Sequence, residues 1–273
     1  MRLFPYWARA HHDGFTALGW SAQSVDDARQ HAEQRAQNMK DRVTASPAGR
    51  EPTPGGYYGA DRPLREEIIE RFGDEPDPAA YALTRNRNGS VVLNAAQVMF
   101  IDIDDDTRPS GGFLSRLFGK KAKQETLPPG LDALAEEGYS LRVYRTAAGW
   151  RVTVLDRLID PAGDESKHVL DTAGADPMYV RLCTTQDCFR ARLTPKPWRC
   201  DTTRPPVAFP FDNDQQEAVY RDWQRQYEAK ASAYTACRFV TTLGPGIVDE
   251  QVAPAAELHD DIACDHTGHK PLA

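Results

Sequence analysis

Hydrophobic positions along the chain follow two different periods, which predicts a protein that contains both strands and helices. Residues 97–103 form a nearly continuous apolar run, as expected for a central strand buried on both faces, and residues 90–93 form a shorter run. Residues from Gln215 to about Tyr234 follow a helical pattern. Further helices are expected near 129–137 and 164–173, and strands at 141–145, 150–155 and 237–241. This alternation of elements indicates an α+β or α/β protein.

The N-terminal third shows a pattern of its own. Short strand-like pieces at 3–4 and 15–18 precede a helical run that begins after Ser24, a residue type that caps helix N-termini. Residues 46–62 are rich in proline and glycine and are typical of a long connection. A second helix is expected over 63–73, because proline suits its first turn and one face would be formed by Leu64, Ile68, Ile69 and Phe72.

The length of 273 residues allows one large domain or two small ones. We expect an N-terminal element over 1–75, made of a ββα unit and a further helix. A core over 76–273 would carry a basic strand and a C-terminal helix. The two parts form either separate domains or one continuous domain. Residues 107–127 are dense in turn-forming and basic residues and are expected to form an insertion.

Composition and charge narrow the class of protein. The 33 lysines and arginines against 40 aspartates and glutamates give a net charge of −7, which disfavours a protein that coats nucleic acid but allows a local basic groove. Five cysteines are an odd number and do not suggest a secreted disulfide framework. The chain has no signal-peptide pattern and no apolar run long enough to cross a membrane. We therefore predict a cytoplasmic globular protein without a membrane partner.

Two carboxylates stand at the end of the apolar run 97–103. Asp102 and Asp104 are two residues apart, so in a strand they point to the same face, while Ile103 points to the core. Two such carboxylates repel each other unless a cation lies between them, and hard oxygen ligands prefer Mg²⁺ or Mn²⁺. The alternative is an acidic cluster that ends the strand in a solvated turn. An unpaired charge inside an apolar run is costly, which favours the metal site.

A turn of small residues links the two strands expected at 141–145 and 150–155. Backbone amides in such a turn can approach an anionic ligand closely. The hydroxyl of Thr146 can donate a hydrogen bond, and Arg151 can bind a phosphate with two hydrogen bonds. The plainer interpretation is an ordinary hairpin turn followed by an arginine.

Residues 181–204 are a basic stretch, with six basic residues against two acidic ones. Arg190 and Arg192 alternate on one face of a strand, as a phosphate-facing pair would. Prolines on both sides of Lys196 would hold that side chain in a rigid extended loop, and Trp198 could stack on a base. The alternative is a surface strand that balances the acidic excess of the chain.

The order of these motifs resembles that of the archaeo-eukaryotic primase and primase-polymerase superfamily. There, a strand ending in Asp-x-Asp precedes a turn with the pattern Ser-Gly-x-Gly-x-His. The corresponding residues here are Asp102 and Asp104, then Thr146 for the serine, Gly149 for the second glycine and Arg151 in place of the histidine. The resemblance covers about residues 97–200. The whole chain also resembles uncharacterised bacterial proteins, a likeness that implies no function.

This resemblance implies an RRM-like fold in which the Asp-x-Asp pair binds the catalytic metals and the second motif contacts an incoming nucleoside triphosphate. We therefore expect an α+β protein with a mixed central sheet of RRM-like type and flanking helices. The leading hypothesis is a metal-dependent nucleotide-binding protein, a nucleotidyltransferase of primase-polymerase type. Its partners would be a nucleoside triphosphate and single-stranded or primed nucleic acid. Catalysis and Mg²⁺ or Mn²⁺ binding fall to Asp102 and Asp104, and nucleotide and phosphate binding to Thr146, Gly149, Arg151, Arg190, Arg192 and Lys196.

Two other functions stay open. The first is a non-catalytic nucleic-acid or protein-binding module that retains the fold, which is favoured by the arginine at position 151 and by an unassigned third carboxylate. Asp201 is the first candidate for that carboxylate, with Asp171 and Asp176 as others. The second is a glycosyltransferase whose Asp-x-Asp pair holds a metal and a nucleotide sugar. The variant Asp102→Asn is expected to abolish metal-dependent nucleotide binding without unfolding the protein.

Some further residues could bind a metal. Cys183, Cys188 and Cys200 are spaced too widely for a typical zinc site, and we expect buried or incidental thiols. The tail of the chain mixes histidine, aspartate and cysteine, and His259 with Asp260 is its more plausible metal-binding part. Polar tails often carry such residues without ordering them.

Overall fold

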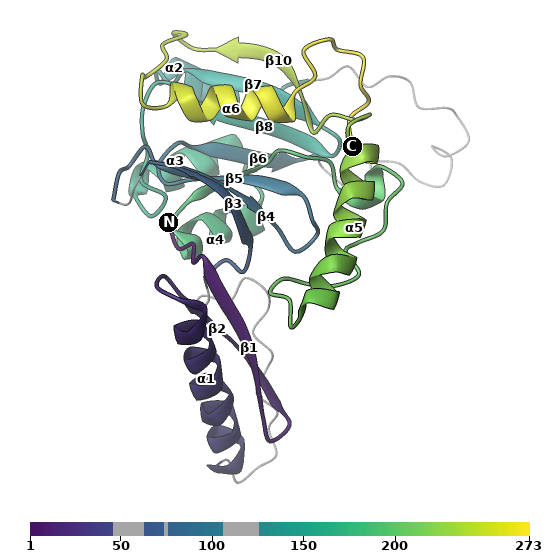
Figure 1. Cartoon of the computed structure of the whole chain (residues 1–273). Helices are drawn as coiled ribbons and strands as arrows, with labels where there is room; N and C mark the ends of the chain where they lie inside the picture. Colours follow the sequence, from purple (N-terminus) through teal and green to yellow (C-terminus); the bar gives the residue numbers. More distant parts are fainter. Residues whose placement is uncertain (46–62, 74–75, 106–125) are drawn as a thin grey trace, which may run out of the picture.

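Strand pairing among the described residues forms three antiparallel sheets, two of which form the core of the molecule (Figure 1). The computed structural model describes residues 1–45, 63–73, 76–105 and 126–273. The connection expected at 46–62 and most of the insertion expected at 107–127 lie outside these residues.

A ββα unit forms the N-terminal part of the chain. Helix α1 packs against a two-stranded hairpin of β1 and β2, with bounds Val25–Ala45, Tyr6–His12 and Phe15–Ser21. Gly19 permits close packing, because a Cβ atom there would lie 2.1 Å from the carbonyl oxygen of Ala28. Ser24 caps the helix as predicted, since its Oγ accepts a hydrogen bond from the backbone N–H of Asp27 over 3.0 Å.

The two core sheets each contain four strands. The first has the order β10-β7-β8-β6, with bounds Cys237–Leu243, Leu141–Thr146, Gly149–Val154 and Phe100–Asp104. The second has the order β3-β4-β5-β9, with bounds Glu67–Phe72, Tyr81–Arg85, Val91–Ala95 and Phe189–Arg192. Short hairpin connections such as those of β4–β5 and β7–β8 give antiparallel neighbours.

Strand β6 is buried as predicted but is the end strand of its sheet. The side chains of Phe100 and Ile101 are fully buried. The neighbouring strand β9 belongs to the other sheet, and the hydroxyl of Tyr179 joins the two. It donates to the carbonyl oxygen of Phe100 over 2.5 Å and accepts from the backbone N–H of Arg190 over 3.3 Å. One tyrosine hydroxyl thus takes a position that ladder hydrogen bonds would fill in a continuous sheet.

Helices surround the sheets. Helix α6 (Ala253–Ala263) lies across one face of the first sheet, where the ring of His259 contacts those of Phe100 and Tyr144 (Figure 1). The long helix α5 (Asp214–Ala231) carries a smaller cluster of buried aromatic residues that includes Trp223 and Tyr227. The other helices of the core are α2 (Gly130–Glu136), α3 (Asp164–Ala173) and α4 (Pro177–Gln186).

The structure confirms the α+β class and corrects several details. The strand pairs of the described sheets are antiparallel, so the expectation of a mixed sheet was wrong; the RRM-like type stays a prediction. Residues 63–73 contain strand β3 instead of a helix, because pairing with β4 and burial of Glu66 outweigh the helical spacing. The tail contains an ordered helix, α6, that the sequence pattern missed.

The N-terminal unit contacts the core at several points. Leu3 forms a parallel bridge with Leu64, and the guanidinium of Arg71 donates to the carbonyl oxygen of Leu3 over 3.0 Å. Arg9 on β1 forms an ion pair with Asp212, just before α5, over 2.5 Å. Within the described residues, no helix has both the length and the apolar character of a membrane span.

Candidate functional site

The two predicted carboxylates stand at the end of β6, beside strand β8. Asp102 is the register partner of Arg151, and Asp104 is the register partner of Gly149. Asp102 and Asp104 share one face of the strand, while Ile103 is buried, 7% exposed. The alternation inferred from the sequence therefore brings both predicted carboxylates next to two residues of the second motif.

Asp102 and the buried Arg151 form an ion pair. Arg151 Nε donates to Asp102 Oδ1 over 2.8 Å, and Nη2 donates to Oδ2 over 3.2 Å. The side chain of Arg151 is 2% exposed and that of Asp102 is 37% exposed. A further donor of the guanidinium reaches the carbonyl oxygen of Arg192 over 2.7 Å. Burial alone would lower the pKa of Arg151, but the carboxylate of Asp102 raises it, so the cation is held in place.

A third carboxylate, that of Asp176, lies at the same site. The backbone N–H of Asp176 donates to the carbonyl oxygen of Asp102 over 3.0 Å, and Asp176 is the N-cap of α4. Burial and the nearby carboxylates of Asp176 and Asp102 raise the pKa of Asp104. Asp201, the first candidate from the sequence, lies in the turn after Arg199, and its carbonyl oxygen accepts a hydrogen bond from Lys230 over 2.5 Å. Asp171 is an exposed residue of α3.

Lys196, in the segment after β9, lies near the carboxylates of Asp104 and Asp102. Burial and the neighbouring guanidinium groups of Arg192 and Arg199 lower the pKa of Lys196, and the carboxylates of Asp104 and Asp102 oppose this shift. Burial and the charge of Arg151 lower the pKa of Arg192 to about 10. Positive charge is therefore crowded on this side of the site, and an anion would relieve the repulsion.

The glycine at the start of β8, Gly149, allows β8 to pack closely against β6. A Cβ atom at Gly149 would lie 2.0 Å from the carbonyl oxygen of Ile103, so the glycine is needed for the close approach of the strands. Thr146 Oγ1 accepts from the backbone N–H of Ala148 over 3.4 Å. The carbonyl oxygen of Ala148 in turn accepts from the backbone N–H of Asp105 over 2.9 Å. Gly149 thus borders the carboxylate end of β6, whereas Thr146 contributes to the turn itself.

Arg190 is directed away from these carboxylates. Its Nη2 donates to both carboxylate oxygens of Glu66 over 2.7 Å, and Thr84 Oγ1 donates to the same carboxylate over 2.6 Å. The side chain of Arg190 is 6% exposed and that of Glu66 is fully buried. In this arrangement Arg190 stabilises the second sheet and has little access to solvent.

A second group of potential metal ligands occurs on α6. The ligating atoms of His259, Asp260 and Cys264 lie within 4.8 Å of one another. Hydrogen bonds already occupy Asp260, whose Oδ1 accepts from Tyr144 over 2.5 Å, and Arg142 forms an ion pair with its Oδ2 over 2.6 Å. Burial would raise the pKa of Asp260, but hydrogen bonds with His259 and Tyr144 lower it. A carboxylate held by these partners is more typical of a structural network than of a metal ligand.

The remaining cysteine expectations are confirmed as buried thiols. Cys183, Cys188 and Cys200 are free and buried. Burial raises the pKa of Cys188 to about 12, and it also raises the pKa of Cys183. Such thiols are protonated and unreactive near neutral pH.

No protein-family model, no curated protein sequence and no solved structure matches the chain.

Proposed function

We propose that the end of β6 binds a divalent cation together with the phosphates of a nucleoside triphosphate, as in enzymes of the primase-polymerase type. The observation that carries this proposal is the placement of three aspartates at the end of β6: Asp102 and Asp104 share one face of the strand, and the backbone N–H of Asp176 donates to the carbonyl oxygen of Asp102. Burial and, after it, repulsion by the carboxylates of Asp176 and Asp102 raise the pKa of Asp104, and a bound cation would offset this repulsion.

The residues present fit Mg²⁺ or Mn²⁺ because their donor atoms are hard carboxylate oxygens. Asp104 and Asp176 are the proposed metal ligands, since Asp102 shares its oxygens with Arg151. The bound cation would neutralise phosphate oxygens and lower the pKa of an attacking hydroxyl group. Lys196 and Arg199 would hold phosphate charge beside it, and Arg151 would position Asp102 instead of contacting the nucleotide, because it is buried.

A non-catalytic nucleic-acid-binding module is a second candidate, and one specific contact favours it. Arg151 already neutralises Asp102 within the protein, which weakens the attraction of the site for a cation. Such a module would bind nucleic acid in a way that is sensitive to salt and indifferent to chelators. The glycosyltransferase hypothesis stays a third prediction, and it requires a preference for nucleotide sugars.

Isothermal titration calorimetry with deoxynucleoside and ribonucleoside triphosphates, with and without Mn²⁺, tests the proposal. We expect Mn²⁺-dependent binding by the wild type and its loss in Asp104→Asn and Asp176→Asn. Asp171→Asn is the matched control, because it removes an exposed carboxylate of α3 that is not one of the three at the end of β6. Asp102→Asn is a poor test, since it leaves Arg151 without its partner.

Each outcome decides between the candidates. Equal binding by the wild type and the Asp104→Asn and Asp176→Asn variants, or binding that ignores Mn²⁺, would refute the metal site. Tighter binding of UDP-glucose than of any triphosphate would favour the glycosyltransferase. Absence of nucleotide binding, combined with chelator-resistant binding of nucleic acid, would favour the non-catalytic module.

A further inference from the structure

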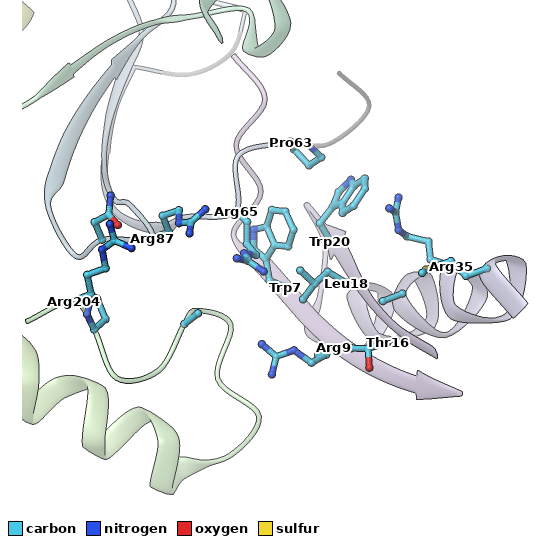
Figure 2. A pocket seen from close by; sticks show the side chains of 15 residues that line it. Trp7, Arg9, Thr16, Leu18, Trp20, Arg35, Pro63, Arg65, Arg87 and Arg204 are labelled. Carbon is cyan, nitrogen blue, oxygen red and sulfur yellow. The ribbon is translucent and has the colours of Figure 1, made fainter. Parts of the chain in front are cut away.

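The cleft between the N-terminal unit and the core does not by itself indicate a ligand. It has a volume of about 660 Å³ and is lined by Trp7, Trp20 and several arginines (Figure 2). Arg9 forms an ion pair with Asp212 over 2.5 Å, and the guanidinium of Arg35 lies 4.6 Å from the ring centroid of Trp20. The other arginines of the lining also have interaction partners. A group with unused chemistry occurs instead at the opposite end of the molecule, where α6 lies beside β10 (Figure 1).

Two cysteines, Cys237 and Cys264, lie side by side where β10 begins and α6 ends. They form a parallel bridge, and beside it the backbone N–H of Ala236 donates to the carbonyl oxygen of Ala263 over 3.1 Å. Cys264 follows the last turn of α6 with an extended backbone, φ −106° and ψ 146°. Paired extended segments are about 4.8 Å apart. This spacing falls within the range of roughly 4.4–6.8 Å between Cα atoms that a disulfide can span.

The two thiols also share their surroundings. Burial raises the pKa of Cys264 to about 12, and the neighbouring Cys237 and Asp260 add to this rise while Arg151 opposes it. Burial likewise raises the pKa of Cys237, with Arg151 again opposing the rise and Asp260 adding to it. Thiols with the same charged neighbours point into the same region, so their sulfur atoms can meet with little movement of the backbone.

The other three cysteines are placed differently. The backbone N–H of Cys188 donates to the carbonyl oxygen of Cys183 over 3.3 Å, but their side chains belong to separate hydrophobic clusters. Cys200 packs in the aromatic cluster of α5. All three side chains are fully buried, whereas Cys264 is only partly buried. Cys237 with Cys264 is therefore the pair that both geometry and access favour.

We propose that Cys237 and Cys264 form a reversible disulfide, with a small-molecule disulfide such as oxidised glutathione as the oxidant. The bond would fasten the end of α6, which lies across one face of the first sheet, to the start of β10 (Figure 1). Neither thiol is stabilised as a thiolate, so the reduced pair gains nothing from ionisation. This favours the disulfide at equilibrium and makes its formation slow.

The reaction proceeds by two thiol–disulfide exchanges. Cys264, the more accessible thiol, loses its proton and attacks one sulfur of oxidised glutathione, whose S–S bond breaks. One glutathione leaves and takes up that proton. The sulfur of Cys237 then attacks that of Cys264, and the second glutathione leaves with the proton of Cys237. Two protein thiols are thereby oxidised, and one glutathione disulfide is reduced to two thiols.

This inference does not rest on the proposed cation site. The full chain, equilibrated in glutathione buffers from reducing to oxidising and then alkylated with N-ethylmaleimide, tests it by mass spectrometry. We expect two of the five thiols to be lost in oxidising buffer and recovered with dithiothreitol. Peptide mapping should assign the bond to Cys237 and Cys264. The oxidised chain should also show a urea midpoint about 1 M higher than the reduced chain, because the bond closes the loop that contains α6.

Variants separate the roles of the two cysteines. Cys264→Ser should abolish the bond. In Cys237→Ala, Cys264 should instead retain one glutathione as a mixed disulfide, because the second exchange has lost its thiol. Cys200→Ser is the matched control: the sulfur donates to the carbonyl oxygen of Pro197 over 3.3 Å, a contact that a serine hydroxyl can replace. This variant should form the bond as the wild type does. Circular dichroism checks that each variant is folded.

Three results would overturn the proposal, and each can be read on the wild type alone. In the first, all five thiols stay reduced in the most oxidising buffer at equilibrium. In the second, peptide mapping assigns the bond to Cys183 and Cys188 or to any other pair. In the third, the bond forms but lowers the urea midpoint, which would show that the native backbone does not hold the two cysteines at disulfide distance.

Discussion

Asp102 and Arg151 face each other across the β6–β8 ladder, and Arg151 Nε donates to Asp102 Oδ1 over 2.8 Å. One of these residues was predicted to hold a metal and the other to hold a phosphate. In the structure they neutralise each other at a position where the arginine is almost completely buried. Charge balance at this pair therefore contributes to stability as well as to the electrostatics of the site.

Removal of Asp102 is expected to destabilise the protein more than removal of Asp104. Asp102→Asn leaves a buried guanidinium without its counter-charge, which should lower the free energy of unfolding by about 2–3 kcal/mol. Urea denaturation followed by circular dichroism measures this. Adding Arg151→Met to Asp102→Asn should recover most of the loss, because no charge is then left unpaired. A stable Asp102→Asn variant would mean that the ion pair contributes little.

Asp104→Asn is expected to stabilise the protein slightly at neutral pH. Burial and two neighbouring carboxylates raise the pKa of Asp104 in the folded state, so the folded protein disfavours the charged form. The stability that the protonated group provides is complete below the unfolded pKa of 3.8 and is lost as the pH rises through the folded pKa.

The gain on removing the charge should be about 0.5 kcal/mol or less, because the side chain is mostly exposed and solvent screens it. Thermal unfolding of the wild type and Asp104→Asn at pH 7 and about pH 4.5 measures it. The difference should shrink at the lower pH. A loss of stability at pH 7 would contradict the repulsion inferred among the three carboxylates.

Much of the fold could be predicted from local patterns. The second strand of the ββα start, strands β5 to β8 and helices α1, α2, α3 and α5 follow from periodicity and capping, whereas the first strand was expected at 3–4 and is Tyr6–His12. Strand β3 could not be identified, because its apolar spacing also suits a helix and its pairing with β4 is a tertiary effect. Helix α6 was missed because its polar and apolar residues look like a disordered tail until Phe100 and Tyr144 are placed against it.

The candidate site was predictable only in part. Alternation in β6 correctly placed Asp102 and Asp104 on one face. Sequence alone could not choose Asp176 as the third carboxylate, since its position depends on a hydrogen bond between the start of α4 and β6. It also could not show that Arg190 is paired with Glu66, because 124 residues separate the two in the chain.

His259 is expected to make stability depend on pH below about 6.5. Burial lowers its pKa in the folded state, and the nearby charge of Arg151 adds to this, although the hydrogen bond with Asp260 opposes it. In the unfolded chain the pKa of this histidine is 6.5. As the pH falls below that value, the unfolded chain binds a proton that the folded protein binds only at lower pH. The free energy of unfolding should therefore decrease by at most about 1.4 kcal/mol per pH unit from this group.

Comparison of His259→Gln with the wild type in urea denaturation between pH 5 and pH 8 isolates the contribution of this residue. The variant should show a smaller decrease of stability toward acid. His168→Gln serves as the control, because His168 is exposed and pairs with Glu137 at the surface. Identical pH profiles for the wild type and His259→Gln would show that His259 takes up its proton equally well in both states.

Gly149→Ala is expected to disturb the end of β6 and with it the carboxylate site. The new Cβ atom would lie 2.0 Å from the carbonyl oxygen of Ile103, and backbone cannot move aside as a side chain can. The strands must separate locally, which should lower the free energy of unfolding by about 2–3 kcal/mol. Gly138→Ala is the contrasting control: its φ of +96° is unfavourable for alanine, but nothing lies within 4 Å of the added atom. There we expect a loss of only about 1 kcal/mol.

Because Asp104 is the register partner of Gly149, only the Gly149→Ala variant should also weaken Mn²⁺-dependent nucleotide binding. Equal losses of stability in the two variants would show that β6 and β8 tolerate a wider separation than this packing implies.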